Sequence, residues 1–104
     1  MERWHDVAGA GDIAPGSFEI VETDDTVAAV FNIDGEYFAV EDVCSHDGAE
    51  LAGGPVEDHQ VICPRHGARF CLKTGRALTP PAYEDIRTFP VRVRDGRVEV
   101  ELPE

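Results

Sequence analysis

Two short stretches of this chain each place one cysteine beside one histidine, and they constrain its fold more than any other feature. The first is Cys44-Ser45-His46 and the second is Cys63-Pro64-Arg65-His66, with sixteen residues between them. Side chains two or three residues apart in a bent loop can face one point, so each pair offers a thiolate and an imidazole to a metal. The sequence therefore predicts a metal centre built from two loops that the rest of the fold brings together.

Two kinds of metal centre accept this set of donors. In one class of [2Fe–2S] centre, two histidines replace two cysteines on one of the irons. Zinc also accepts two cysteines and two histidines, although its structural sites more often pair like residues and the Cys-x-His spacing is unusual for them. The spacing favours the iron–sulfur centre and leaves structural zinc as the alternative. Gly48 and Gly67 follow the two pairs, and we expect them to let backbone N–H groups approach the cluster sulfurs.

The length and charge of the chain limit its partners. Its 104 residues suit one domain, and its 21 acidic and 9 basic residues give a net charge of −12. This charge repels nucleic acid and anionic membranes and favours a basic protein partner, although it equally suits a well-solvated surface. No apolar run approaches the length of a membrane span, and the first residues do not resemble a signal peptide. The third cysteine, Cys71, leaves an odd number, which argues against a disulfide framework and for a reducing cytoplasm.

The remaining sequence reads as short strands separated by turns. Apolar and charged residues alternate on both sides of Asp95-Gly96, which predicts the strongest hairpin, and Ile33-Asp34-Gly35 predicts another. No segment shows a convincing helical period, apart from a possible turn near residues 47–51. We expect one all-β domain over residues 1–104, an antiparallel sandwich or barrel with an inserted cluster-binding subdomain at residues 42–82. The predicted strands are residues 4–7, 17–22, 27–32, 36–40, 60–62, 69–72, 91–94 and 97–101.

Around the two pairs, the chain resembles the Rieske-type ferredoxins, especially those that serve bacterial ring-hydroxylating oxygenases. The resemblance is carried by residues 44–49 (CSHDGA) and 63–70 (CPRHGARF), and it continues through Lys73-Thr74-Gly75, Pro80-Pro81 and the closing hairpin. It implies that the Pro80-Pro81 loop covers the cluster, with a simple turn as the alternative. It also implies four ligands to one [2Fe–2S] cluster, the cysteines on one iron and the histidines on the other through Nδ1: Cys44, Cys63, His46 and His66.

The same resemblance indicates a low reduction potential. The high-potential relatives in cytochrome bc complexes carry an extra cysteine in each motif, and these two form a disulfide; the matching positions here are Ala49 and Arg65. Those relatives also donate hydrogen bonds to the cluster from a serine and a tyrosine, where this chain has Ala68 and Phe70. Without those donors the added electron is less stabilised. We therefore expect a potential toward the lower end of the Rieske range of about −150 to +300 mV.

The resemblance implies a soluble, monomeric one-electron carrier, which is a component of an oxygenase system and not an enzyme. It would take electrons from an NAD(P)H-dependent flavoprotein reductase and pass them to a terminal non-haem iron oxygenase. The alternatives are a small subunit of a nitrite reductase-like complex, a redox or iron sensor or cluster-assembly protein, and the zinc module. We expect His5 and His59 on the surface, and Cys71, Trp4 and Phe89 in the core. Two spare histidines without a second domain do not supply the mononuclear iron site of an oxygenase.

Overall fold

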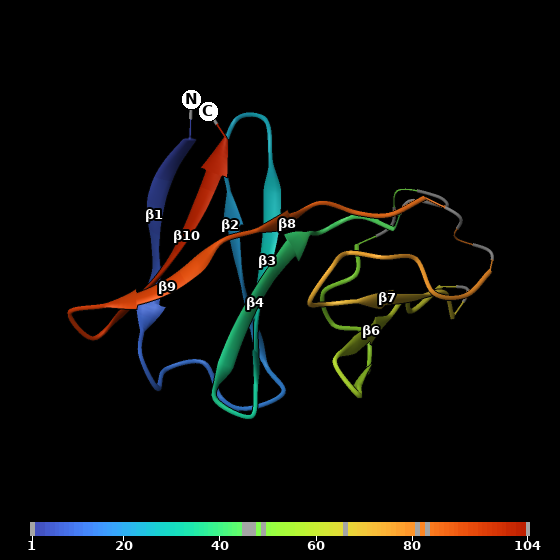
Figure 1. Cartoon of the computed structure of the whole chain (residues 1–104), viewed down its shortest axis with the longest axis horizontal. Coiled ribbons are helices and arrows are strands. Elements are labelled where there is room, and N and C mark those ends of the chain that lie inside the picture. Colours follow the sequence, from blue (N-terminus) through green and yellow to red (C-terminus); the bar gives the residue numbers. More distant parts are fainter. Residues whose placement is uncertain are drawn as a thin grey trace.

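The structure, a computed structural model, describes residues 2–44, 48, 50–65, 67–80, 82 and 84–103. Within them, ten strands form three antiparallel sheets in the orders β1-β10-β9, β2-β3-β4-β8 and β5-β6-β7 (Figure 1). These residues contain no helix, and hence none long and apolar enough to cross a membrane. The expected all-β antiparallel fold is confirmed. The strands are β1 (Glu2–Gly9), β2 (Phe18–Glu22), β3 (Val27–Ile33), β4 (Glu36–Glu41), β5 (Val56–Glu57), β6 (Gln60–Ile62), β7 (Arg69–Cys71), β8 (Thr88–Phe89), β9 (Val91–Arg94) and β10 (Arg97–Pro103).

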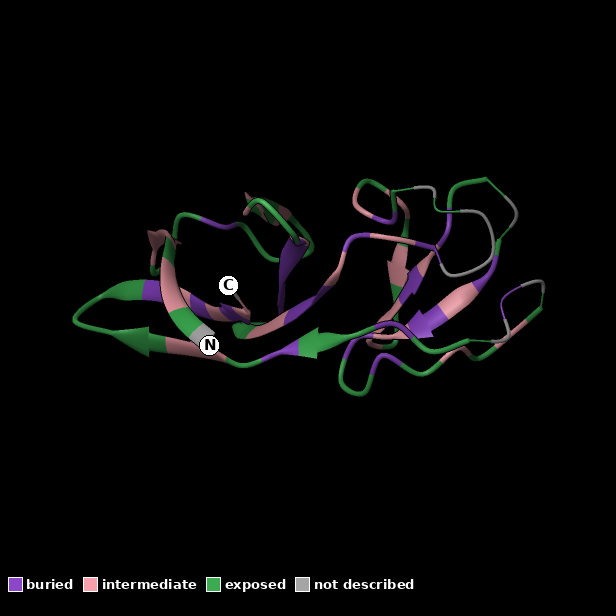
Figure 2. Ribbon diagram, turned by 90° about the horizontal axis from the view of Figure 1, so that it is seen from above, coloured by how far each residue is buried: buried purple, intermediate pink, exposed green. Residues whose placement is uncertain are grey.

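The sheet that contains β3 forms the middle layer, and both of its faces are covered (Figures 1 and 2). Ala28 and Val30 belong to a core cluster shared with the buried residues of β10. Ala29 and Phe31 point to the opposite face of the same sheet. They belong to a second cluster, which they share with residues of the segment that carries the β5-β6-β7 sheet. Because both faces are buried, β3 reads as an almost continuous apolar run, whereas β10 alternates between buried and more exposed residues.

Two regions can now be named. The sandwich comprises residues 2–41 and 88–103, in which the β1-β10-β9 sheet packs against the β2-β3-β4-β8 sheet and the two ends of the chain lie side by side (Figure 1). The inserted lobe comprises residues 42–87, between β4 and β8, and carries the short strands β5, β6 and β7. Both Cys/His stretches lie in the inserted lobe.

Three two-residue turns connect strand pairs, and both residues of each turn have positive φ. Asp34–Gly35 joins β3 to β4 and Asp95–Gly96 joins β9 to β10, as the sequence predicts, with φ of 52° and 92° and of 51° and 75°. The third turn, Asp58–His59, joins β5 to β6 with φ of 49° and 61°, although it lacks a glycine. Two contacts hold His59 there: its ring meets the Phe38 ring edge-on, and its carbonyl accepts a hydrogen bond from the Leu72 N–H. His59 is therefore partly buried and not the fully solvated residue that was expected.

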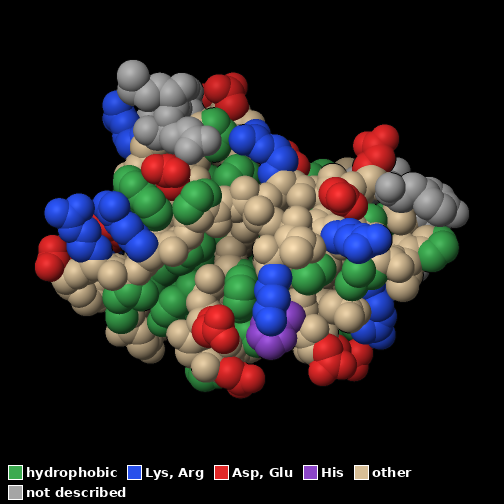
Figure 3. Space-filling model, in the orientation of Figure 1, with side chains coloured by type: hydrophobic (Ala, Val, Ile, Leu, Met, Phe, Trp, Pro, Cys, Tyr) green, Lys and Arg blue, Asp and Glu red, His purple; other side chains and the backbone are tan. Residues whose placement is uncertain are grey.

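Two expectations about β1 are wrong. Trp4 pairs with Glu101 and is only partly buried, because it lies on the outer face of its sheet, where the Arg92 guanidinium stacks 4.0 Å from its ring centroid. His5 is opposite the buried Val100, so it faces inward, and its Nε2 is buried. The expected burial of Phe89, by contrast, is confirmed. Basic side chains gather over the β9–β10 hairpin, next to carboxylates (Figure 3).

Candidate metal centre

The two cysteines of the Cys/His stretches occupy equivalent places in the inserted lobe. Cys44 follows the last residues of β4, and Cys63 directly follows β6. Each has 1% of its surface exposed, and both belong to the core cluster that also contains Leu51 and Phe70. Neither forms a disulfide. Two buried thiols enclosed by apolar side chains and not joined to each other suit ligation of a metal shielded from water.

Each cysteine begins a turn of the same length. The Gly48 N–H donates a hydrogen bond to the Cys44 carbonyl over 2.7 Å, and the Gly67 N–H donates one to the Cys63 carbonyl over 3.0 Å. Both glycines have positive φ, 77° and 76°, which a side chain would strain. The N–H groups of the two glycines thus close the turns, and the expectation that other backbone N–H groups approach the cluster sulfurs stays a prediction.

The two turns have the same length although the Cys-x-His and Cys-x-x-His spacings differ. Each glycine lies four residues after its cysteine. His46 and His66 themselves lie outside the described residues, as do Asp47 and Ala49. Of the possible helical turn near residues 47–51, the described residues 48, 50 and 51 are not helical. Among the residues described, no three His, Cys, Asp or Glu side chains converge on one point.

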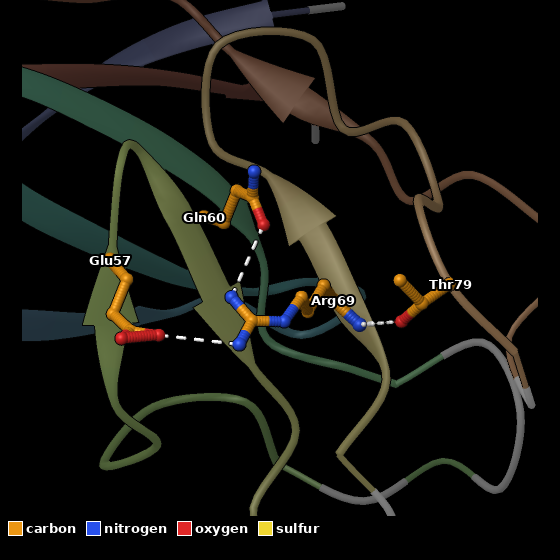
Figure 4. Close-up of polar contacts among 4 residues, drawn as sticks. All are labelled: Glu57, Gln60, Arg69 and Thr79. Carbon is orange, nitrogen blue, oxygen red and sulfur yellow. Dashed lines mark hydrogen bonds and ion pairs between the residues drawn. The ribbon is translucent and has the colours of Figure 1, made fainter.

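Arg69 ties the second turn to the rest of the lobe (Figure 4). Its guanidinium lies 3.4 Å from the Gln60 side-chain oxygen and 3.2 Å from a Glu57 carboxylate oxygen, so it links β7 to β5 and β6. Its backbone N–H donates to the Thr79 hydroxyl over 3.0 Å, and its carbonyl accepts from the Leu78 N–H over 2.8 Å. The segment that leads to Pro80 is thereby held along β7. Pro80 is exposed, and Pro81 lies outside the described residues.

The apolar replacements next to the second turn are fully buried. Ala68 and Phe70 are both 0% exposed and lie in the same cluster as the two cysteines. Neither side chain can donate a hydrogen bond. At these two positions the thiols therefore lack the hydroxyl donors that a serine and a tyrosine would supply. This agrees with the expectation that the reduced state of the cluster is weakly stabilised.

Cys71 differs from the other two cysteines. It lies at the end of β7 and is only partly buried, so the expectation of a core cysteine is wrong. Partial burial raises the pKa of its thiol, but hydrogen bonds from the Thr74 hydroxyl and from the Lys73 and Thr74 backbone, together with the Lys73 charge, outweigh that effect. The pKa of Cys71 therefore lies below its ordinary value of 9.0.

A small all-β fold with two matching Cys/His turns, whose buried thiols form no disulfide, defines a metalloprotein of the iron–sulfur or zinc-binding class. Residues 3–90 match the family described as the Rieske [2Fe–2S] domain. The chain belongs to this family. Its cofactor is accordingly a [2Fe–2S] cluster, and the structural-zinc alternative is set aside.

Named relatives narrow the class further. The chain is 43% identical, over 94 residues, to the 3-phenylpropionate/cinnamic acid dioxygenase ferredoxin subunit of Escherichia coli K12. The matched residues cover 89% of this chain and 88% of that subunit. It is 32% identical to a chain in the complex of reduced oxygenase and oxidised ferredoxin of carbazole 1,9a-dioxygenase, with a TM-score of 0.88 and coverage of 93% and 91%. It is also 27% identical to a protein described as an NADH-dependent nitrite reductase small subunit from Mycobacterium tuberculosis, with a TM-score of 0.88 and coverage of 100% and 98%. The chain is thus an electron-transfer component and not a catalytic enzyme.

Proposed function

We propose that this protein carries single electrons from an NAD(P)H-dependent flavoprotein reductase to a terminal non-haem iron oxygenase. The observation that carries the proposal is its similarity, over most of its length, to a dioxygenase ferredoxin subunit and to a chain from an oxygenase–ferredoxin complex. We further propose that it acts as a monomer in the cytoplasm. The three cysteines, none of them in a disulfide, support a reducing compartment.

We also propose that the inserted lobe holds the cluster through four ligands. The burial of both cysteines and the equal turns that begin at them support this assignment. When bound, the cluster supplies one-electron redox chemistry, and the chain holds it and shields it from water. The ligands would be Cys44 and Cys63 on one iron and His46 and His66 on the other.

A nitrite reductase-type role is the second candidate. It is favoured by the similarity to the small subunit from Mycobacterium tuberculosis, which spans the whole of this chain. The fold alone does not separate the two roles, because the TM-scores to the ferredoxin and to the small subunit are equal. The higher identity to the dioxygenase ferredoxin subunit favours the oxygenase role.

The first experiment uses the purified protein alone, before and after dithionite. We expect the optical and EPR spectra of a [2Fe–2S] cluster with mixed Cys/His ligation, and a midpoint potential below about +100 mV. Stoichiometric zinc, or spectra of an all-cysteine cluster, would contradict the ligand assignment. A potential well above +100 mV would contradict the argument from the missing hydroxyl donors.

The second experiment asks which partner receives the electron. We expect the reduced protein to be reoxidised quickly by a ring-hydroxylating oxygenase and much more slowly by the large subunit of a nitrite reductase. The reverse preference would overturn the oxygenase role while leaving the carrier role intact.

The charge of the chain makes the same assay informative about docking. The sandwich and the terminal residues Met1 and Glu104 carry fourteen acidic and four basic residues, a net −10, whereas the inserted lobe carries seven and five, a net −2. The acidic sandwich would steer the approach of a basic partner, while the lobe itself remains nearly neutral. We therefore expect the transfer rate to fall as ionic strength rises. If the transfer rate does not change with ionic strength, the acidic charge contributes to solubility and not to docking.

A further inference from the structure

Asp42 is a buried acidic residue between the end of β4 and Cys44. It is 8% exposed, and its backbone N–H donates to the Val27 carbonyl of β3 over 2.8 Å. One of its carboxylate oxygens, Oδ1, accepts hydrogen bonds from the N–H groups of both Leu51 and Ala52, each over 2.8 Å. A buried carboxylate is costly unless it is hydrogen-bonded, so these two donors account for its place in the core.

These hydrogen bonds close the first Cys/His loop at its base. Asp42 and Leu51 are nine residues apart, and Cys44 and His46 lie between them. Leu51 is 0% exposed and belongs to the same core cluster as both cysteines. The carboxylate therefore joins the start of the loop, which is attached to the sandwich, to the point where the loop returns to the core.

The same contacts continue to the second loop. The Gly54 N–H donates to the Leu51 carbonyl over 3.0 Å, and Gly54 packs so closely on Ile62 that an added Cβ would lie 2.0 Å from the Ile62 carbonyl oxygen. The Ile62 N–H in turn donates to the Pro55 carbonyl, and Ile62 is the residue before Cys63. A continuous set of contacts thus connects the Asp42 carboxylate to the backbone next to the second thiol.

We propose that Asp42 is a positioning residue for the iron–sulfur centre, holding the Cys44 loop in register with Cys63 and lowering the reduction potential through its negative charge. This inference depends on the proposed ligand role of the two cysteines. Reduction adds a negative charge to the cluster, and a fixed carboxylate two residues before the proposed ligand Cys44 disfavours that step. Partners that hold a metal ligand from behind commonly change metal affinity about 10- to 100-fold when they are removed.

Two substitutions separate the charge from the hydrogen bonds. Asp42→Asn keeps an oxygen that can accept both N–H groups but removes the charge, so we expect an intact cluster spectrum and a higher midpoint potential. Asp42→Ala removes both, so we expect the cluster to be lost to a chelator about tenfold faster than in the wild type.

Asn32→Ala is the matched control. Asn32 is 4% exposed and also makes two hydrogen bonds to the backbone, but within the sandwich: it donates to the Ile13 carbonyl over 2.7 Å and accepts from the Gly35 N–H over 2.8 Å. We expect this variant to unfold at a lower temperature with an unchanged potential and an unchanged rate of cluster loss in the folded protein.

The outcomes decide the proposal. A wild-type potential in Asp42→Asn, or cluster loss in Asp42→Ala no faster than in Asn32→Ala, would reduce Asp42 to an ordinary structural residue. If Asp42→Ala does not fold, the potential of Asp42→Asn decides. None of these measurements uses a partner protein, so a failure of the oxygenase role does not affect them. Retention of the normal cluster in Cys44→Ser would instead overturn the ligand assignment.

Discussion

The sandwich and the inserted lobe keep their shapes by different means. In the sandwich, β1 and β10 pair along seven positions and β3 and β4 along six, with buried side chains between the two sheets. In the inserted lobe, β5, β6 and β7 are only two or three residues long. Strands this short are not stable by themselves. Besides the apolar cluster that it shares with β3, the lobe is held by close backbone contacts at glycines, by side chains that bond to backbone groups, and by the cluster it is proposed to bind.

Side chains also bond to the backbone near the end of the lobe. The Asp85 carboxylate accepts from the Ala77 N–H over 2.9 Å, and the Thr74 hydroxyl accepts from the Arg76 N–H over 3.2 Å. Gly75 packs so closely on Ile86 that an added Cβ would lie 2.0 Å from the Ile86 carbonyl oxygen. A region built this way owes its order to a few specific contacts, so it should respond to local changes that the sandwich tolerates.

Removal of the cluster should give the largest difference between the two regions. In iron-free protein we expect the amides of β6 and β7 to exchange with solvent about 100-fold faster or more, because metal binding and folding of a small metal-binding region are coupled. Amides of β3 and β4 should change little. Amide hydrogen exchange, read before and after chelation and after reconstitution with iron and sulfide, measures both regions at once. Uniform acceleration across the chain would mean that sandwich and lobe unfold as one unit, and the comparison would fail.

Adjacent glycines offer a smaller and more local test. Gly54→Ala places a Cβ against the Ile62 carbonyl oxygen, so we expect a loss of about 2–3 kcal/mol in the free energy of unfolding. Gly53 has a φ of +93° but open space around it, so Gly53→Ala should cost about 1 kcal/mol through backbone strain alone. Urea unfolding followed by cluster absorbance for the lobe and by fluorescence of Trp4 for the sandwich gives both values. Equal losses in the two variants would show that the close approach of Gly54 to Ile62 contributes nothing to stability.

The sequence was most informative about the sandwich, where local signals are strong. The Asp-Gly turns and the alternation around them predicted the β3–β4 and β9–β10 hairpins. β8 was missed because it has two residues and is followed by Pro90, and the β5–β6 hairpin was missed because its turn holds His59 where a glycine is usual. Trp4 was misplaced because a large aromatic residue suggests a core position, and a cation stacked on its outer face leaves no local signal.

For the candidate site, the sequence predicted donor residues, which stay a prediction, but not the local architecture around them. The paired motif identified the cysteines, and their burial agrees with that role. The equal length of the two turns was not predicted, because the histidines stand at different distances from Cys44 and Cys63 and so mask the equal spacing between each cysteine and its glycine. Asp42 was also missed, because the groups it binds are backbone N–H groups nine and ten residues away, and backbone donors look alike at every position of a sequence.

A surface ion pair of the sandwich should give the smallest effect. Arg97 of β10 donates to both carboxylate oxygens of Asp6 on β1, over 2.9 and 2.6 Å, but both side chains are at least half exposed. The hydrogen bond and the charge of Arg97 lower the pKa of Asp6 below its ordinary value of 3.8. Because the folded-state pKa is the lower one, the pair stabilises the fold fully above pH 3.8 and loses this effect as the pH falls through the folded-state value. Water screens such an exposed pair, so the effect stays small.

Asp6→Asn should therefore lower the urea midpoint slightly at pH 7, with a difference from wild type that holds down to pH 3.8 and shrinks as the pH falls below that value. Trp4 fluorescence reports unfolding of the sandwich, and Arg97→Gln with the double variant completes the cycle that isolates the pair. A difference that grows as the pH falls would have the wrong sign for a carboxylate with a lowered pKa. An effect as large as that of Gly54→Ala would show that one exposed ion pair stabilises the sandwich as strongly as a close backbone contact stabilises the lobe. We expect the opposite, because the sandwich depends on long strand pairs and a buried core, whereas the lobe depends on a few specific contacts.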